Sequence, residues 1–256
     1  AKVIDLYKQS GNDIARSNSL FLTATRSFNQ GLAREIVDHI AGYIIISGLS
    51  DYRMHVLAEQ SLVNDSTRKK MVELLKLADT GIEDIYRKEI ARDGVPQSPA
   101  EYMTITRRNQ FDKEGNPGNQ VDFYMFTEES EGTKKMFEIS PAILQSLEQG
   151  RPLVMDEFDA RFHPLLSRKL VELYNSVSNK NAQLIFATHD TNLLNSRLLR
   201  RDQICFVEKD RQGASHFYSL ADFKGVRNDA SYEKDYIAGK YGAIPFLGDF
   251  QSIFED

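Results

Sequence analysis

Two adjacent carboxylates, Asp156 and Glu157, directly follow the apolar run Leu153–Met155. The run predicts a buried strand, and α/β proteins bind their ligands beyond the carboxyl ends of such strands. Mg²⁺ prefers oxygen ligands and keeps several waters, so the first carboxylate suits a metal shell and the second suits activation of a water that attacks a phosphate. An acidic turn without chemical function is the alternative, because strands frequently end in such turns.

A histidine follows the next apolar run. Leu184–Phe186 predicts a second buried strand, and Ala187, Thr188 and His189 come directly after it. If the two strands are neighbours, the imidazole lies at the same edge of the sheet as the carboxylates. There it can donate a hydrogen bond to a γ-phosphate and respond to its loss. A capping or core histidine is the competing interpretation, although His189 stands in a polar turn rather than on an apolar face.

Ser130 and Gly132 open a third segment, which continues as a helix through Met136, Phe137 and Ile139. A serine hydroxyl and the backbone N–H groups at a helix N-terminus together form an anion site. In isolation, this segment is better explained as an ordinary helix cap with Ser130 as the capping residue. Its position in the chain, ahead of the other two segments, favours the anion site.

The order of the three segments is typical of ABC and SMC-type ATPase heads, which have a signature motif, a Walker B strand and a switch histidine in this order. More closely, the chain resembles the AAA15 family of ATPases, the RloA or abortive-infection type of bacterial defence loci. The resemblance covers about residues 128–249, extends to 18–40, and is loose over 50–100. It rests on ESEGTKKMF, PLVMDEFDARFHPLLSRKLVELYN, NAQLIFATHDTNLL, LLRRDQICFVEKD, YGAIPFLGDF and NSLFLTATRSFNQGLAREIVDHI.

The resemblance implies a role for each residue of the site. Ser130 and Gly132 would contact the γ-phosphate of an ATP molecule bound by a second protomer. Asp156 would link to Mg²⁺, Glu157 would activate water, and His189 would be the switch.

The segment Asp159–His163 stands where ABC proteins have their D-loop, so the resemblance also implies nucleotide contacts from Asp159 and His163. Many ABC proteins have an aspartate at the position of His163. The RecF-like branch often has Leu-His-Pro there, which Phe162-His163-Pro164 resembles. Pro164 could equally just begin the following helix.

One motif of such ATPases does not occur in the sequence. The pattern G-x-x-x-x-G-K-[ST] is absent, and the nearest candidate, Gly239-Lys240-Tyr241, lacks both the earlier glycine and the hydroxyl. That loop would cradle the α- and β-phosphates. Either the amino-terminal lobe that carries it lies outside this sequence, or a natural half-protein borrows or lacks ATP binding.

Other elements must position these segments. The helical spacing of Gly31–Tyr43 predicts a helix that leads into the buried run Ile44–Ile46. A second helical pattern begins after Asn64-Asp65-Ser66, which offers capping oxygens, and carries apolar residues from Val72 to Ile90. A β-hairpin is expected over Tyr102–Phe126, and an antiparallel hairpin from Ile204 to Tyr218 is expected at the margin of the sheet. A helix over Leu165–Tyr174 should connect the two parallel strands, and these strands should be buried on both faces.

These elements predict an α/β fold, namely an ABC/SMC-like P-loop NTPase head with a mostly parallel central sheet, a helical insertion and antiparallel β additions. Residues 1–127 are expected to form the rest of the head lobe, with the insertion at about 50–100 and the hairpin at 102–126. Residues 128–256 are expected to form the ATPase core with its signature helix, Walker B strand and switch histidine.

The composition fits this class. A chain of 256 residues is long enough to build a large core. Its net charge of −5 argues against a protein whose whole surface is positively charged for binding nucleic acid, although a local basic patch could still bind it. No run is apolar enough to span a membrane and no signal peptide is recognisable, so we expect a cytoplasmic protein. The single cysteine, Cys205, is expected to be a thiol buried in a strand.

Two functions follow from these observations. The first is a Mg²⁺-dependent ATPase that closes as a head-to-head dimer or higher homo-oligomer on ATP and controls a partner effector. The resemblance implies a companion encoded nearby, often an RloB-like protein with a Toprim-type nuclease core, as this effector. The second is a non-catalytic scaffold or sensor head with degenerate nucleotide binding. The missing phosphate loop favours the scaffold, whereas Glu157 and His189 favour the ATPase.

Overall fold

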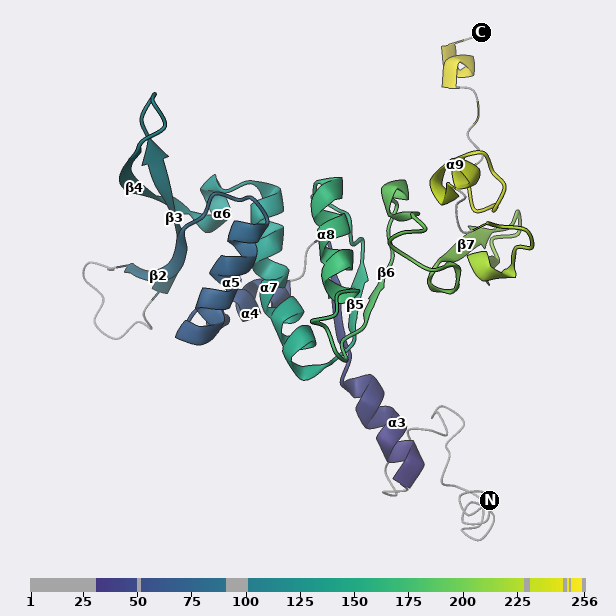
Figure 1. The fold of residues 1–256 in the computed structure, drawn as a ribbon, viewed down its shortest axis with the longest axis horizontal. Coiled ribbons are helices and arrows are strands. Elements are labelled where there is room, and N and C mark those ends of the chain that lie inside the picture. Colours follow the sequence, from purple (N-terminus) through teal and green to yellow (C-terminus); the bar gives the residue numbers. More distant parts are fainter. Residues whose placement is uncertain are drawn as a thin grey trace. The chain divides into compact units, whose positions relative to one another are not determined.

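The computed structural model describes residues 31–49, 52–90, 101–227, 231–245, 248 and 250–254 (Figure 1). Contacts between residues divide the chain into two compact units. Unit 1 comprises the described residues of Ala1–Asp156 together with Val177–Phe186. Unit 2 comprises those of Glu157–Ser176 and Ala187–Asp256. The expected boundary after residue 127 separates the ATPase core from the rest of the head by function, whereas the two units are divided by contacts. That boundary therefore stays a prediction.

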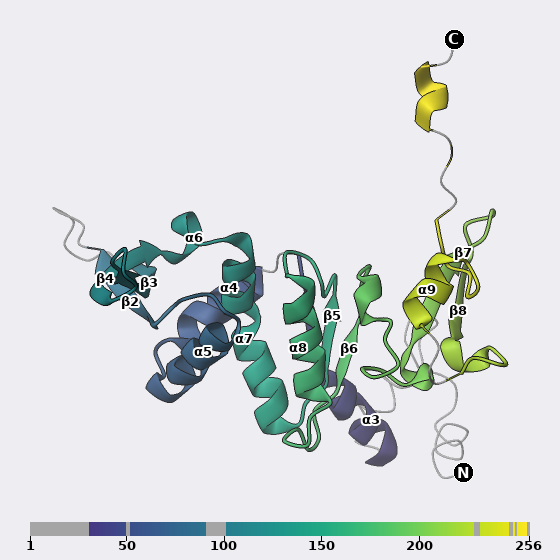
Figure 2. The ribbon, with the colours of Figure 1, turned by 45° about the horizontal axis from the view of Figure 1, so that its top comes forward.

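Unit 1 contains a three-stranded parallel sheet with β5 at its centre. The order is β1-β5-β6, with bounds Ile44–Ser47, Leu153–Asp156 and Leu184–Phe186. β6 runs parallel to β5, as the two apolar runs predict, and Figure 2 shows β5 beside β6. β1 also runs parallel to β5, a pairing that the sequence pattern does not specify. The expected helix before β1 is α3 (Gly31–Ala41). Asp156 therefore lies at the carboxyl end of the central strand.

One face of this sheet is buried and the other is open. Ile46, Leu153 and Met155 are at most 3% exposed, whereas Ile45 and Ile185 on the opposite face are 61% and 48% exposed. The expectation of strands buried on both faces is therefore wrong for the described residues. Side chains alternate between the two faces of a strand, and an apolar run does not by itself show that something covers both.

The longest helix of unit 1 is α7 (Glu131–Gln149), and α4 (Tyr52–Ser61) and α5 (Asp65–Leu77) both pack against it. Of the three residues expected to offer capping oxygens, Asn64 is the N-cap of α5, since its side chain accepts a hydrogen bond from the Thr67 backbone N–H at 3.0 Å. α7 ends at Gly150, which has φ 67°. A Cβ atom at that position would lie 2.8 Å from the Asn181 Cβ, so both conformation and space require glycine.

After α5 the chain turns back and continues as a strand. Asp79 and Gly81 have φ values of 58° and 71°, which a helix does not accommodate. The predicted continuation of the helix is therefore wrong, because β2 (Asp84–Ile90) occupies its second half. Ile82 and Ile85 are fully buried, but a spacing of three residues also fits a turn followed by a strand.

β2 belongs to an antiparallel sheet of order β2-β3-β4, in which β3 is Glu101–Phe111 and β4 is Pro117–Tyr124. The β3–β4 pair is the expected hairpin, and β2 adds a third strand that the sequence pattern does not indicate. The short helix α6 (Met125–Glu128) follows β4. The alternation of apolar residues had placed Met125 in the strand, but this fully buried residue begins α6 instead.

Unit 2 begins with the segment after β5 and contains the expected helix between the two parallel strands, α8. Its hairpin of β7 and β8 pairs antiparallel, as predicted, but forms its own two-stranded sheet rather than the margin of the parallel one. The elements are α8 (Pro164–Tyr174), η1 (Thr191–Leu193), η2 (Arg201–Gln203), β7 (Cys205–Lys209), β8 (Ser215–Ser219), η3 (Leu220–Asp222), α9 (Tyr232–Ile237) and η4 (Phe250–Phe254).

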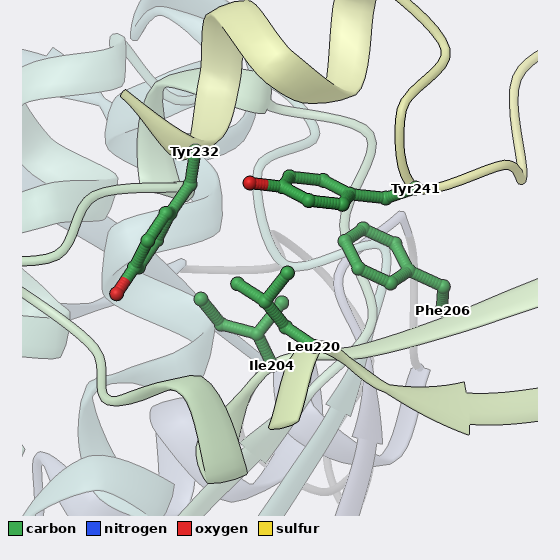
Figure 3. Close-up of a cluster of buried hydrophobic side chains, with 5 residues drawn as sticks. All are labelled: Ile204, Phe206, Leu220, Tyr232 and Tyr241. Carbon is green, nitrogen blue, oxygen red and sulfur yellow. The ribbon is translucent and has the colours of Figure 1, made fainter. Parts of the chain in front are cut away.

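An aromatic cluster forms the core around this hairpin (Figure 3). The rings of Phe206 and Tyr241 stack with centroids 5.9 Å apart, and Tyr232 packs at the start of α9. Ile204 and Phe206 are buried, so Cys205 between them points outward and is exposed. The expectation of a buried thiol is therefore wrong, because alternation along the strand gives its neighbours the inner face.

Within the part of the chain that the structure describes, no helix has the length and apolar character needed to cross a membrane.

Titration of Tyr241 links the stability of unit 2 to alkaline pH. Burial, followed by the hydrogen bond that its hydroxyl donates to Asp235 at 3.1 Å, raises the pKa of Tyr241 from 10.0 to about 12. The folded state prefers the neutral phenol, so this stabilisation is complete below pH 10 and is lost as the pH rises through about 12. We expect Tyr241→Phe to lose less stability over this range than the wild type in chemical unfolding. Tyr52→Phe, at a 79% exposed position, is the control, and equal pH dependence of Tyr241→Phe and wild type would contradict the assignment.

Candidate functional site

Glu157 is the first residue after β5 and has an unusual backbone conformation. Its φ of 52° lies in the left-handed region, which costs a residue other than glycine about 1–2 kcal/mol. Strain of this kind is concentrated at functional sites because the surrounding structure must hold it in place. Glu157 is half-buried, while Asp156 at the strand end is exposed.

The Asp159 carboxylate connects the segment after β5 to the segment after β6. The Thr188 hydroxyl donates to Asp159 Oδ1 at 2.5 Å, and the backbone N–H of His189 donates to the same oxygen at 3.2 Å. A third bond runs from the Phe158 N–H to the Ala187 carbonyl at 3.0 Å. Hydrogen bonds to a charged acceptor are stronger than neutral ones, so Asp159 fixes the backbone at His189.

The His189 side chain is exposed, and the described residues provide no hydrogen-bond partner for its ring. Its neighbour Asp190 uses one oxygen to accept hydrogen bonds from the backbone and side chain of Asn192, at 3.0 and 2.6 Å. The other oxygen, Oδ2, is buried without a partner in the described part of the chain. A buried carboxylate oxygen needs a donor, so a water or a ligand group is expected there.

His163 has a structural task in this geometry. It is the N-cap of α8, and its Nδ1 accepts a hydrogen bond from the backbone N–H of Leu165 at 3.2 Å. Pro164 is the first residue of α8, which agrees with the simpler interpretation of that proline. The nucleotide contact implied for His163 stays a prediction, and the exposed ring leaves its Nε2 side accessible to solvent.

Ser130 and Gly132 belong to unit 1, where they form the start of α7. Ser130 is the N-cap, and its hydroxyl oxygen accepts from the Thr133 N–H at 3.2 Å and lies 2.9 Å from the Thr133 hydroxyl. Gly132 is in the first turn of the helix. A capping hydroxyl accepts a hydrogen bond and keeps its own O–H as a donor, so capping and phosphate binding are compatible tasks for one serine.

The chemistry at Asp156 fits a magnesium ion. Mg²⁺ takes one or two protein carboxylates and completes its shell with waters and substrate phosphates. Asp156 offers an exposed carboxylate at the strand end, and the Gly48 N–H donates to its backbone carbonyl at 2.6 Å, which anchors the strand end to the loop after β1. Among the described residues no cluster of three acidic, histidine or cysteine side chains could hold a metal alone.

Two parts of this arrangement are not predicted from the sequence. Thr188 was noted only as the residue before the histidine, but its hydroxyl is a main contact of Asp159. Glu129, directly before Ser130, is bonded to Arg108 and Thr106 in a way that no motif indicates. A small hydroxyl residue before the histidine was the available signal for Thr188. No local signal existed for Glu129, because its partners are more than 20 residues away.

Removal of the Asp159 carboxylate should loosen the segment after β6. Asp159→Ala deprives Thr188 and His189 of their shared acceptor, which should lower the free energy of unfolding of unit 2 by roughly 1–3 kcal/mol. Hydrogen exchange should become faster in peptides that cover residues 187–190. Asp202→Ala is the matched control, because Asp202 bonds to Arg200 on an exposed surface. Unchanged exchange in Asp159→Ala would show that other contacts hold the segment.

Comparison with known families supplies independent information. Residues 116–195 match the family described as "AAA domain, putative AbiEii toxin, Type IV TA system". No individual curated protein matched the chain. The matched segment is less than half of the chain, and it extends from β4 to just after η1. All the predicted site residues fall inside it, so the part of the chain from Ser130 to His189 is similar to an AAA domain.

Proposed function

We propose that this protein is a Mg²⁺-dependent ATPase of the ABC type, in which Glu157 activates water, Asp156 holds the metal and His189 reports the state of the γ-phosphate. The observation that carries this proposal is the link made by Asp159, which ties the backbone of His189 to the segment of Glu157 within unit 2. A link between these two loops is what coordinated hydrolysis needs. Loss of the phosphate could then be transmitted from one loop to the other.

The roles follow from the chemistry of each group. Phosphoryl transfer is catalysed mainly by positioning and electrostatics, so a carboxylate that orients water and a bound cation supply most of what is needed. The strained φ of Glu157 supports a role that depends on the exact position of its side chain. The exposed imidazole of His189 is available as a hydrogen-bond donor. Mg²⁺, when bound, would neutralise charge on the phosphates.

The start of α7 completes the proposal. Ser130 and Gly132 would bind the γ-phosphate of an ATP held by a second copy of the chain, through the hydroxyl and the N–H groups of the first turn. Such a site explains why nucleotide would drive a two-fold head-to-head dimer. The effector that this dimer would control, a Toprim-type nuclease, is proposed from family resemblance alone.

A scaffold or sensor head is the second candidate, and two observations favour it. Ser130 and His163 both have complete explanations as helix caps. The sequence also contains no G-x-x-x-x-G-K-[ST] motif. In this alternative the geometry around Asp159 serves only to stabilise unit 2, and substitutions at Glu157 leave function unchanged.

Substitution of the two carboxylates separates their proposed roles. In the complete protein, Glu157→Gln should reduce single-turnover hydrolysis by about 10²–10⁴-fold with little change in ATP affinity, because a general base acts mainly in the transition state. Asp156→Asn should in addition raise the Mg²⁺ concentration needed for binding. Both are measured by rapid-quench hydrolysis beside equilibrium nucleotide binding. Hydrolysis at the wild-type rate in Glu157→Gln would reject the mechanism and favour the scaffold.

Association in Mg-ATP tests the role of the α7 start. We expect Glu157→Gln, which preserves bound ATP, to sediment as a dimer. Adding Gly132→Asp should abolish the dimer, since a carboxylate at this turn suits the helix dipole but repels a phosphate. Glu131→Asp, in the same turn, keeps the charge unchanged and should leave association intact. A protein that stays monomeric in every nucleotide state would contradict the head-to-head arrangement.

A further inference from the structure

An ion pair between a buried carboxylate, Glu129, and a partly buried arginine, Arg108, lies directly beside the proposed signature serine, and its task is not explained by the roles above. The side chain of Glu129 is only 4% exposed, although carboxylates are rarely buried unless paired. Arg108 binds it with two nitrogens, Nη2 to Oε2 at 2.5 Å and Nε to Oε1 at 3.1 Å. The hydroxyl of Thr106 donates to Oε1 at 2.6 Å. Three donors thus hold one carboxylate.

The donors come from the middle strand of the antiparallel sheet. Thr106 and Arg108 are alternate residues of β3, so both project from the same face of it. Thr106 is fully buried, and the Arg108 guanidinium lies over the ring of Phe123 on β4, 5.9 Å from its centroid. The planar, two-pronged bond of an arginine fixes the orientation of a carboxylate as well as its position.

We call the bonds from Arg108 and Thr106 to the Glu129 carboxylate the clamp. A further contact of Arg108 extends it to the turn before β2. Arg108 Nη1 donates to the backbone carbonyl of Thr80. A Cβ atom added at Gly81 would lie 2.9 Å from that nitrogen, so this glycine leaves room for the guanidinium as well as supplying a φ of 71°. The Arg108 guanidinium therefore joins β3 to the turn before β2 and to the residue that precedes the N-cap of α7.

Glu129 and Ser130 are consecutive residues with extended backbone, φ −80° and −66°. A side chain held at one of them restricts the other, because adjacent Cα atoms are fixed at about 3.8 Å. Ser130 in turn caps α7 through Thr133. Both residues line the same open cavity of about 460 Å³ as Arg108 and Thr80. The position of the capping hydroxyl thus depends on the clamp next to it.

We infer that Glu129 is a positioning residue, clamped by Arg108 and Thr106, through which the β2-β3-β4 sheet sets the geometry of Ser130 at the start of α7. The consequence for ATP rests on the proposed function: if Ser130 binds the nucleotide of a second protomer, a shift of this sheet changes how readily the dimer closes. The sheet is then a control element for the site, and Glu129 acts through Ser130 without touching nucleotide.

The first test uses no nucleotide. Glu129→Gln keeps the shape of the side chain but removes the charge, and Thr106→Val removes one hydroxyl with little change in volume. In both variants of the complete protein, exchange in peptides covering residues 129–136 should become roughly five- to tenfold faster. Glu148→Gln is the matched control at the other end of α7, where Glu148 is half exposed and pairs with Lys70. Unchanged exchange at residues 129–136 in both Glu129→Gln and Thr106→Val would overturn the inference.

The second test measures association and catalysis in Mg-ATP. Glu129→Gln should raise the protein concentration for half-maximal specific ATPase rate by about tenfold, while the ATP affinity of the monomer stays within about twofold. General structural damage would instead lower affinity together with thermal stability. Equal concentration dependence of Glu129→Gln and wild type would overturn the link from Glu129 to closure. A wild type that neither associates nor hydrolyses ATP would reject the proposed function, and the exchange experiment would still decide the positioning role.

Discussion

The Asp159 carboxylate accepts hydrogen bonds from the side chain of Thr188 and the backbone of His189, and the order of unit 2 around the candidate site depends on it. Parallel pairing of β5 and β6 brings two strand ends to one edge of the sheet, but it does not determine how the following loops fold. The shared acceptor performs that task. Under the proposed function, the Glu157 carboxylate and the His189 imidazole would need this degree of preorganisation, since misplacement by about 1 Å can cost about 10²-fold in rate.

In unit 1 a second carboxylate, Glu129, also holds a segment in place by accepting several hydrogen bonds. Glu129 is held by donors from β3 and precedes the serine that caps α7, just as Asp159 follows Glu157 and holds the segment of His189. In both places an acidic residue next to a proposed functional residue bonds to an element distant in sequence. The carboxylate acts as an acceptor for several donors at once, which a neutral side chain does less strongly.

Local patterns were sufficient for much of the fold. Apolar runs and helical spacing predicted β5, α8, β6 and the start of α7, and the three site segments were recognised from their order along the chain. Patterns failed where non-local contacts decide. The turn at Asp79 and Gly81 converts a helical spacing into β2, and Cys205 is exposed because its neighbours occupy the inner face. No local pattern predicts the clamp on Glu129, because Arg108 and Thr106 are distant in sequence and contact it only in the folded chain.

The left-handed backbone at Glu157 has an implication for the balance between folding and chemistry. Glycine would adopt this φ without strain, and the fold would gain about 1 kcal/mol from it even after glycine's greater entropy in the unfolded chain is counted. A carboxylate at this point is therefore not the choice that maximises stability. Selection for thermostability alone would be expected to favour glycine here, and under the proposed function the resulting protein would lose its general base, which is the usual form of a stability–activity trade-off.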